Sequence, residues 1–134
     1  MYMKVESHKN SIRESLEELE SAVNRGIENR QKTIGFHCSS AAVNMLEIYL
    51  HNKNLVDPGF QLKHNDFGSE KMALDKLHFD FESKDEIVKI MVDIERKRNV
   101  LCYGKQQDKE IIEKYMETFN KLKNLVESMG VKYE

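Results

Sequence analysis

Apolar residues recur at spacings of three and four along most of this chain, and this periodicity constrains its fold more than any other feature. A single proline, Pro58, occurs, and the helix formers Leu, Glu, Lys and Met are abundant. No segment shows the strict alternation of a half-buried strand. With 134 residues, 40% of them hydrophobic, the chain has the size and composition of one globular domain. The sequence therefore predicts a single all-α domain over residues 1–134.

The first half of the chain contains two predicted long helices. A capping box at Ser11–Glu14 predicts that the first helix begins at Ser11 and continues to about Gln31. The second helix is predicted over residues 33–52, and it should lie centrally because apolar residues cover so much of its circumference. Asp57–Gly59 follows with the proline–glycine order that a type II turn prefers.

The second half predicts one short helix and two long ones. The short helix should begin near Asp66 or Ser69. A second capping box, Ser83–Glu86, opens a strong helix that should stop at Gly104. The last helix is predicted over residues 106–129. Four long helices, one short helix and brief connections together predict an antiparallel up-down bundle.

The predicted core-facing stripes follow from the spacing of apolar residues on each helix. The stripe of the first helix consists of Ile12, Leu16, Leu19, Val23 and Ile27. The stripe of the last helix consists of Ile111, Tyr115, Phe119, Leu122 and Val126.

Charge and targeting features narrow the function classes. The formal net charge of −2 argues against a general nucleic-acid coat protein, which would normally be basic, and leaves room for a local basic patch. No stretch approaches the roughly 20 apolar residues of a membrane span, and the first residues do not form a signal peptide. We therefore expect a cytoplasmic protein that has no membrane partner. Cys38 and Cys102 are expected to be reduced and buried.

One charged residue falls on an apolar stripe. Projected at about 100° per residue, Arg98 lies close to the direction of Met91 and Ile94. An unpaired guanidinium at such a position is costly. Arg98 is therefore expected either to bridge to an acidic residue of a neighbouring helix or to bind an anion such as a phosphate. Asn99 beside it is expected either to hydrogen-bond the same ligand or to cap carbonyls near the helix end.

The segment Arg98-Asn99-Val100-Leu101-Cys102-Tyr103-Gly104 resembles the signature of HEPN domains, which are helical bundles of prokaryotic toxins and nucleotidyltransferase partners. Their hallmark is an arginine, usually followed by a polar residue, and then a histidine after four to six positions. The order of helices is similar as well. Here Tyr103 occupies the place of the histidine, and no histidine follows it.

The resemblance implies a function and a set of partners. In active members the arginine and the histidine act in metal-independent RNA cleavage, often across a dimer interface. Tyrosine, with a reference pKa of about 10, is a poor replacement for histidine in proton transfer. The leading hypothesis is therefore a protein that binds a nucleotide, an RNA phosphate or a small nucleotidyltransferase, without efficient catalysis. A homodimer with the motif near its interface is expected by the same analogy.

The candidate ligand-binding residues are Arg98, Asn99, Tyr103 and Lys105, and the candidate catalytic residues are Arg98 and Tyr103. Lys105 belongs to a basic stretch from Arg96 to Lys109, for which a solvated face is favoured over an RNA groove. One alternative function is a ribonuclease that tolerates tyrosine. Another is a plain interaction bundle, in which Arg98 would be tied to a carboxylate of the same chain.

No cofactor and no metal site are predicted. The sequence has no glycine-rich phosphate loop, no Cys-x-x-Cys pair and no Glu-x-x-His pattern of di-iron bundles. His37, His51, His64 and His78 are scattered, and they are interpreted as surface or capping residues. His37 and His51 are almost four helical turns apart and cannot ligate one metal ion unaided.

Overall fold

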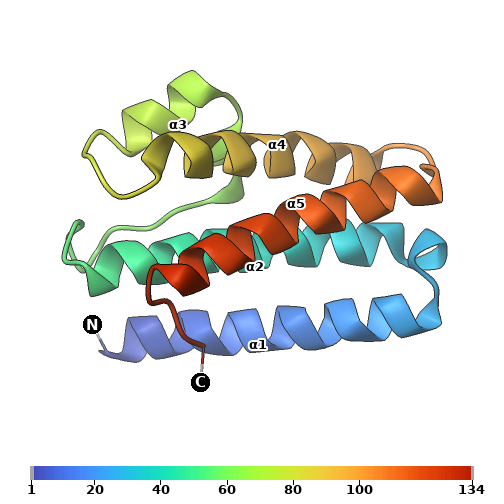
Figure 1. Ribbon diagram of the computed structural model, residues 1–134, viewed down its shortest axis with the longest axis horizontal. Helices are drawn as coiled ribbons and strands as arrows, with labels where there is room; N and C mark the ends of the chain where they lie inside the picture. Colours follow the sequence, from blue (N-terminus) through green and yellow to red (C-terminus); the bar gives the residue numbers. More distant parts are fainter. Residues whose placement is uncertain (1, 134) are drawn as a thin grey trace.

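The computed structural model describes residues 2–133, and within this range the chain is helical and contains no strand (Figure 1). The all-α prediction is confirmed. Three of the four long helices begin and end within a few residues of the predicted bounds. The elements are α1 (Tyr2–Arg25), η1 (Ile27–Arg30), α2 (Gln31–Asn52), η2 (His64–Phe67), α3 (Glu70–Lys76), α4 (Lys84–Tyr103) and α5 (Lys109–Ser128).

The first helix differs most from its prediction. α1 begins at Tyr2, so the capping box at Ser11–Glu14 lies inside the helix and does not start it. The predicted continuation to Gln31 is also wrong. Gly26 has a φ of 98°, a left-handed conformation that favours glycine, and it ends α1 at Arg25. A single 3₁₀ turn then leads into α2.

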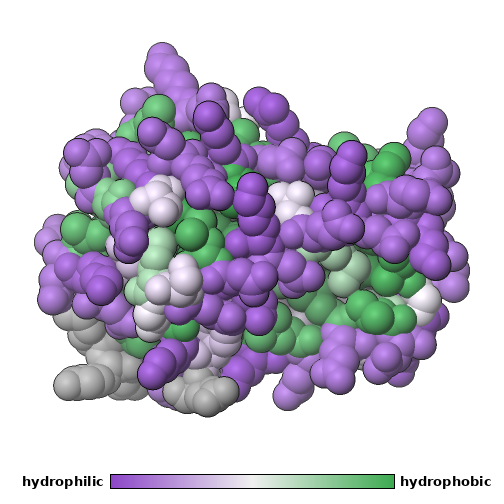
Figure 2. All heavy atoms as spheres, in the orientation of Figure 1, coloured by the Kyte–Doolittle hydropathy of each residue, from purple (hydrophilic) through white to green (hydrophobic). Residues whose placement is uncertain are grey.

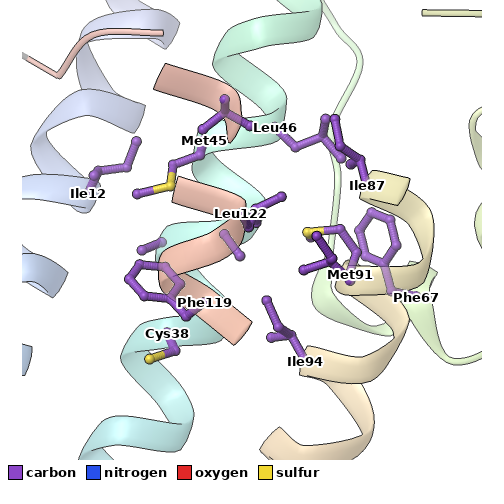
Figure 3. Packing of buried hydrophobic residues seen from close by; sticks show 14 of the residues in the cluster. Ile12, Cys38, Met45, Leu46, Phe67, Ile87, Met91, Ile94, Phe119 and Leu122 are labelled. Atoms are coloured by element: carbon purple, nitrogen blue, oxygen red, sulfur yellow. The ribbon is translucent and has the colours of Figure 1, made fainter. Parts of the chain in front are cut away.

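α2 lies at the centre of the fold, as predicted, and contacts α1, α4 and α5. Gly35 allows α2 a close approach to α4, because a Cβ on this residue would lie 2.9 Å from Leu101 Cβ and 3.1 Å from Cys102 Sγ. α2 and α4 run in opposite directions, as the colour sequence in Figure 1 shows. The interior between α2, α4 and α5 is filled by buried apolar side chains, among them Cys38, Leu46, Met91, Ile94, Phe119 and Leu122 (Figure 3).

The predicted stripes are correct in their centres and shifted at their edges. Tyr115 and Phe119 are buried in the core, as predicted. Val23 and Ile111, which the spacing places inside, are among the more exposed apolar residues. Their chain neighbours take the inner positions, namely Ala22 and Ile112. Cys38 is buried and Cys102 is half-buried, and both are free thiols.

Three local signals between α2 and α4 give mixed outcomes. Ser69 caps α3, since its Oγ accepts a hydrogen bond from the Met72 N–H at 3.1 Å. Ser83 precedes α4 as predicted, but its φ of 59° leaves no side-chain capping bond, so the predicted capping box does not form. The turn at Asp57–Gly59 is present, but Gly59 lacks the positive φ that a type II turn requires.

The face of the molecule seen in Figure 2 is dominated by hydrophilic side chains with smaller apolar areas between them. In the described part of the chain, no helix combines the length and the apolar character that a membrane crossing demands.

Candidate functional site: a polar groove along α2

A groove of about 460 Å³ runs along one side of α2 and includes the arginine that the sequence singled out. Phe36, Ser39 and Asn44 lie on its floor, provided by α2. The segment 61–65, which includes the start of η2, provides one wall, and Arg98 of α4 also lines the groove. We call this cavity the α2 groove. Its volume lies in the range typical of small-molecule sites.

Arg98 is buried and yet not neutralised. The residue is 8% exposed. Its Nη1 donates a long hydrogen bond of 3.4 Å to Asn99 Oδ1, and its Cζ lies 6.0 Å from the centre of the Tyr103 ring. Among the described residues, no carboxylate comes within 4 Å of the guanidinium. The ion pair with an acidic residue, one of the two alternatives expected for Arg98, is therefore not formed with any described residue.

The other three predicted ligand-binding residues lie outside the groove. Asn99 and Tyr103 are exposed, and the structure brings them to Arg98 without placing either on the groove lining. Lys105 is also exposed and does not line the groove. Its carbonyl instead accepts a hydrogen bond of 3.0 Å from Gln31 Nε2.

The end of α4 that carries Arg98 is fixed by side chains of α2. Gln31 is buried, and its Nε2 donates to the Leu101 carbonyl at 3.1 Å as well as to Lys105. Its Oε1 accepts from the Gln107 N–H at 2.7 Å. The bond to Leu101 satisfies one of the carbonyls that the end of α4 leaves without an internal partner. These hydrogen bonds hold the motif segment against the first turn of α2.

His64 is a groove residue that the sequence did not reveal as one. Its Nδ1 lies 2.9 Å from Oε2 of Glu95, a carboxylate that is 5% exposed. Because the carboxylate accepts, Nδ1 carries the proton and Nε2 is the nitrogen left for other partners. The two residues are 31 positions apart, and His64 is the first residue of the short 3₁₀ turn η2, which has no periodic pattern, so no sequence signal predicted this pair.

Glu47 connects the groove wall to the bundle. Its Oε2 accepts from the Leu62 N–H at 3.3 Å, and its Oε1 lies 3.3 Å from His8 Nε2 and 3.5 Å from His51 Nε2. His8 Nδ1 lies 2.5 Å from Asn44 Oδ1. His51 is buried, so its interpretation as a surface or capping residue is wrong. A buried carboxylate needs such partners.

The groups whose pKa is clearly displaced are buried or half-buried, and none of them lines the α2 groove. Burial raises the pKa of the Cys38 and Cys102 thiols and of the Tyr115 hydroxyl, and it lowers the pKa of His37. Thiols with raised pKa values are poor nucleophiles. Within residues 2–133, no group of three or more His, Cys, Asp or Glu side chains is arranged to hold a metal ion.

Comparisons with protein-family models, curated proteins and solved structures give no match. The resemblance to HEPN domains is thus a resemblance of the seven-residue motif and of the order of helices.

Proposed function

We propose that this chain binds the phosphate group of a nucleotide or of RNA in the α2 groove, with Arg98 as the main ligand and without efficient catalysis. One observation carries the proposal: Arg98 is buried, lines the groove and has no carboxylate within 4 Å of its guanidinium among the described residues. A buried cation without a counter-charge is costly, and an anion in the groove would remove that cost. Arginine matches a phosphate with two parallel charge-assisted hydrogen bonds.

The rest of the groove supports an anion at the Arg98 end. Lys63 and His64 line the same groove from the facing segment. The two carboxylates nearby are already engaged: Glu95 with His64, and Glu47 with Leu62 and two histidines. Oxygens of both carboxylates thus already accept hydrogen bonds from donors of the chain, His64 and the Leu62 N–H.

The resemblance adds partners and an architecture to this proposal. It implies two partners, a small nucleotidyltransferase subunit and a second copy of the chain in a homodimer with the motif near its interface. The fold it implies is an up-down bundle of four long helices. Tyr103 is 78% exposed and Val100 is 44% exposed beside the motif, which gives an apolar surface for such a contact. Co-purification and light scattering on the full chain test both partners.

Binding of adenosine 5′-monophosphate, measured by calorimetry at low salt, tests the phosphate site. Removal of the charge in Arg98→Gln should weaken binding by about 10- to 100-fold, which corresponds to the loss of hydrogen bonds to a charged group. Arg96→Gln is the matched control, because Arg96 is exposed on the same helix and does not line the groove. Equal affinities for the two variants would refute the proposal.

A second candidate, metal-independent RNA cleavage, is favoured by the His64–Glu95 pair beside Arg98. A histidine oriented by a carboxylate next to a phosphate ligand has the parts needed for general acid–base catalysis. This candidate expects RNA cleavage in the presence of a chelator, lost in His64→Gln and kept in His78→Gln, whose histidine is exposed outside the groove. Intact RNA over a wide pH range with the folded protein would dismiss it.

A further inference from the structure

We propose that the α2 groove reads the base of its ligand through stacking on Phe36, so that the ligand is a nucleotide unit with an unpaired base. This inference rests on the proposed phosphate contact of Arg98 and makes it more specific. It assigns a role to an apolar side chain of a helix whose apolar residues were expected to face the core.

Phe36 is an exposed aromatic ring on a helix that is otherwise buried nearly all round. It is 49% exposed and lines the groove, whereas Ile34 and Cys38 on either side of it are fully buried. A half-exposed phenyl ring has a cost in water that a stacked base would remove. Stacking on aromatic side chains is the common way in which proteins hold unpaired bases.

The ring is held in place before any ligand binds. It meets the His37 ring at 88°, with a centre-to-centre distance of 5.0 Å. His37 is in turn fixed by a hydrogen bond of 3.0 Å between its Nδ1 and Ser15 Oγ of α1. Burial lowers the pKa of His37, which favours the neutral ring at physiological pH. A fixed ring loses little conformational freedom when a base stacks on it.

The spacing between the ring and Arg98 follows from helix packing. Gly35 lies against Leu101 and Cys102, and the two helices run in opposite directions. Arg98 is three residues before Leu101, so it lies about three residues beyond Gly35 along α2. Along the axis of α2, the backbones of Phe36 and Arg98 are therefore offset by about two residues, roughly 3 Å.

Polar groups of α2 continue the groove beyond Arg98. Ser39, Ser40 and Asn44 line it, and the floor from Phe36 to Glu47 extends over about 16 Å at 1.5 Å per residue. An aromatic surface, a cation and a row of hydroxyl and amide groups complement a base, a phosphate and a ribose. A phosphorylated peptide would use the cation and leave the ring uncovered.

Four ligands presented to the wild-type chain separate these contributions: inorganic phosphate, ribose 5-phosphate, adenosine 5′-monophosphate and a 5′-phosphorylated single-stranded tetraadenylate. We expect the monophosphate to bind at least about tenfold more tightly than ribose 5-phosphate, as base stacking on an aromatic ring would give. A tetraadenylate affinity well above that of the monophosphate identifies an RNA strand as the source of the nucleotide, and equal affinities identify the free nucleotide.

The Phe36→Leu variant removes the ring and keeps an apolar side chain. It should lose the tenfold preference for the monophosphate and retain the affinity for ribose 5-phosphate, while Phe36→Tyr should keep the preference. Ile111→Ala, which changes an exposed apolar residue outside the groove, is the control.

Two results would overturn the inference. Equal wild-type affinities for ribose 5-phosphate and the monophosphate would remove base reading and leave phosphate binding in place. A Phe36→Leu variant that changes the oligomeric state and not the preference would assign the ring to a protein interface. Absence of binding to all four ligands would instead reject the proposed function.

Discussion

The two sides of α2 differ in character and in role. Toward α4 and α5 it is apolar and closely packed, with Gly35 against Leu101 and Leu46 fully buried. Toward the groove it carries Ser39, Asn44 and Glu47. The first side stabilises the bundle through buried apolar area, and the second keeps polar groups in place at a cost that specific partners offset. The difference indicates that stability and ligand binding should respond to different substitutions.

The largest effect is expected on the apolar side. Leu46→Ala removes a fully buried side chain and should lower the free energy of unfolding by about 2–5 kcal/mol. Val43→Ala, on the half-buried groove side, should cost about 1 kcal/mol or less. Urea denaturation of both variants measures the difference, and similar costs would erase the distinction between the two sides.

The close contact of α2 with α4 predicts the next effect. A Cβ in Gly35→Ala would lie 2.9 Å from Leu101 Cβ, so the helices must move apart. We expect a loss of about 1–3 kcal/mol in the free energy of unfolding, although alanine is the better helix former. Gly59→Ala is the control, because nothing lies within 4 Å of the added carbon. Thermal unfolding of the two variants tests this; a neutral Gly35→Ala would show that the contact is loose.

Substitution of Arg98 should change the stability little, in contrast to substitutions on the apolar side of α2. Since no carboxylate among the described residues pairs with it, Arg98→Met should change the free energy of unfolding by no more than about 1 kcal/mol, in either direction. Chemical denaturation gives the value. A loss of several kcal/mol would mean that the guanidinium serves the fold, as the interaction-bundle alternative requires.

The smallest effect concerns His37, which connects the groove side to α1. Burial lowers its pKa in the folded chain, so the unfolded chain takes up a proton first as the pH falls. The stability from neutral His37 is therefore present above about pH 6.5 and declines below that value. The free energy of unfolding should decline less steeply between pH 7.5 and pH 5 in His37→Gln than in the wild type. His78→Gln should retain the wild-type slope.

Sequence periodicity predicted the helices where local pattern and packing agree. The predicted bounds 33–52 and 106–129 lie within three residues of the observed bounds of α2 and α5, because the apolar spacing of each helix is set by the side chains that it buries. Capping boxes were poorer guides. Ser11 lies within α1 and Ser83 adopts a left-handed conformation, so a weak local preference was overruled in both places.

The site was predictable only in part. Arg98 was identified because a charge on an apolar stripe is costly wherever the chain folds. His64, Glu95 and Glu47 were missed, since each gains its role from a partner 15 or 31 residues away, across a segment without periodicity. Phe36 belongs to a helix predicted to be apolar over much of its circumference, and its exposure depends on where the segment 61–65 leaves the groove open.

Nuclear magnetic resonance titration with adenosine 5′-monophosphate tests the central claim most directly, because it reports on the Arg98 side chain itself. We predict that the Arg98 Nε–H signal and the amide signals of Ser39 and Asn65 shift together and saturate at one ligand concentration. Shifts that gather at Lys105 and Lys109, with the Arg98 signal unchanged, would contradict the account and place any anion binding on the exposed basic stretch.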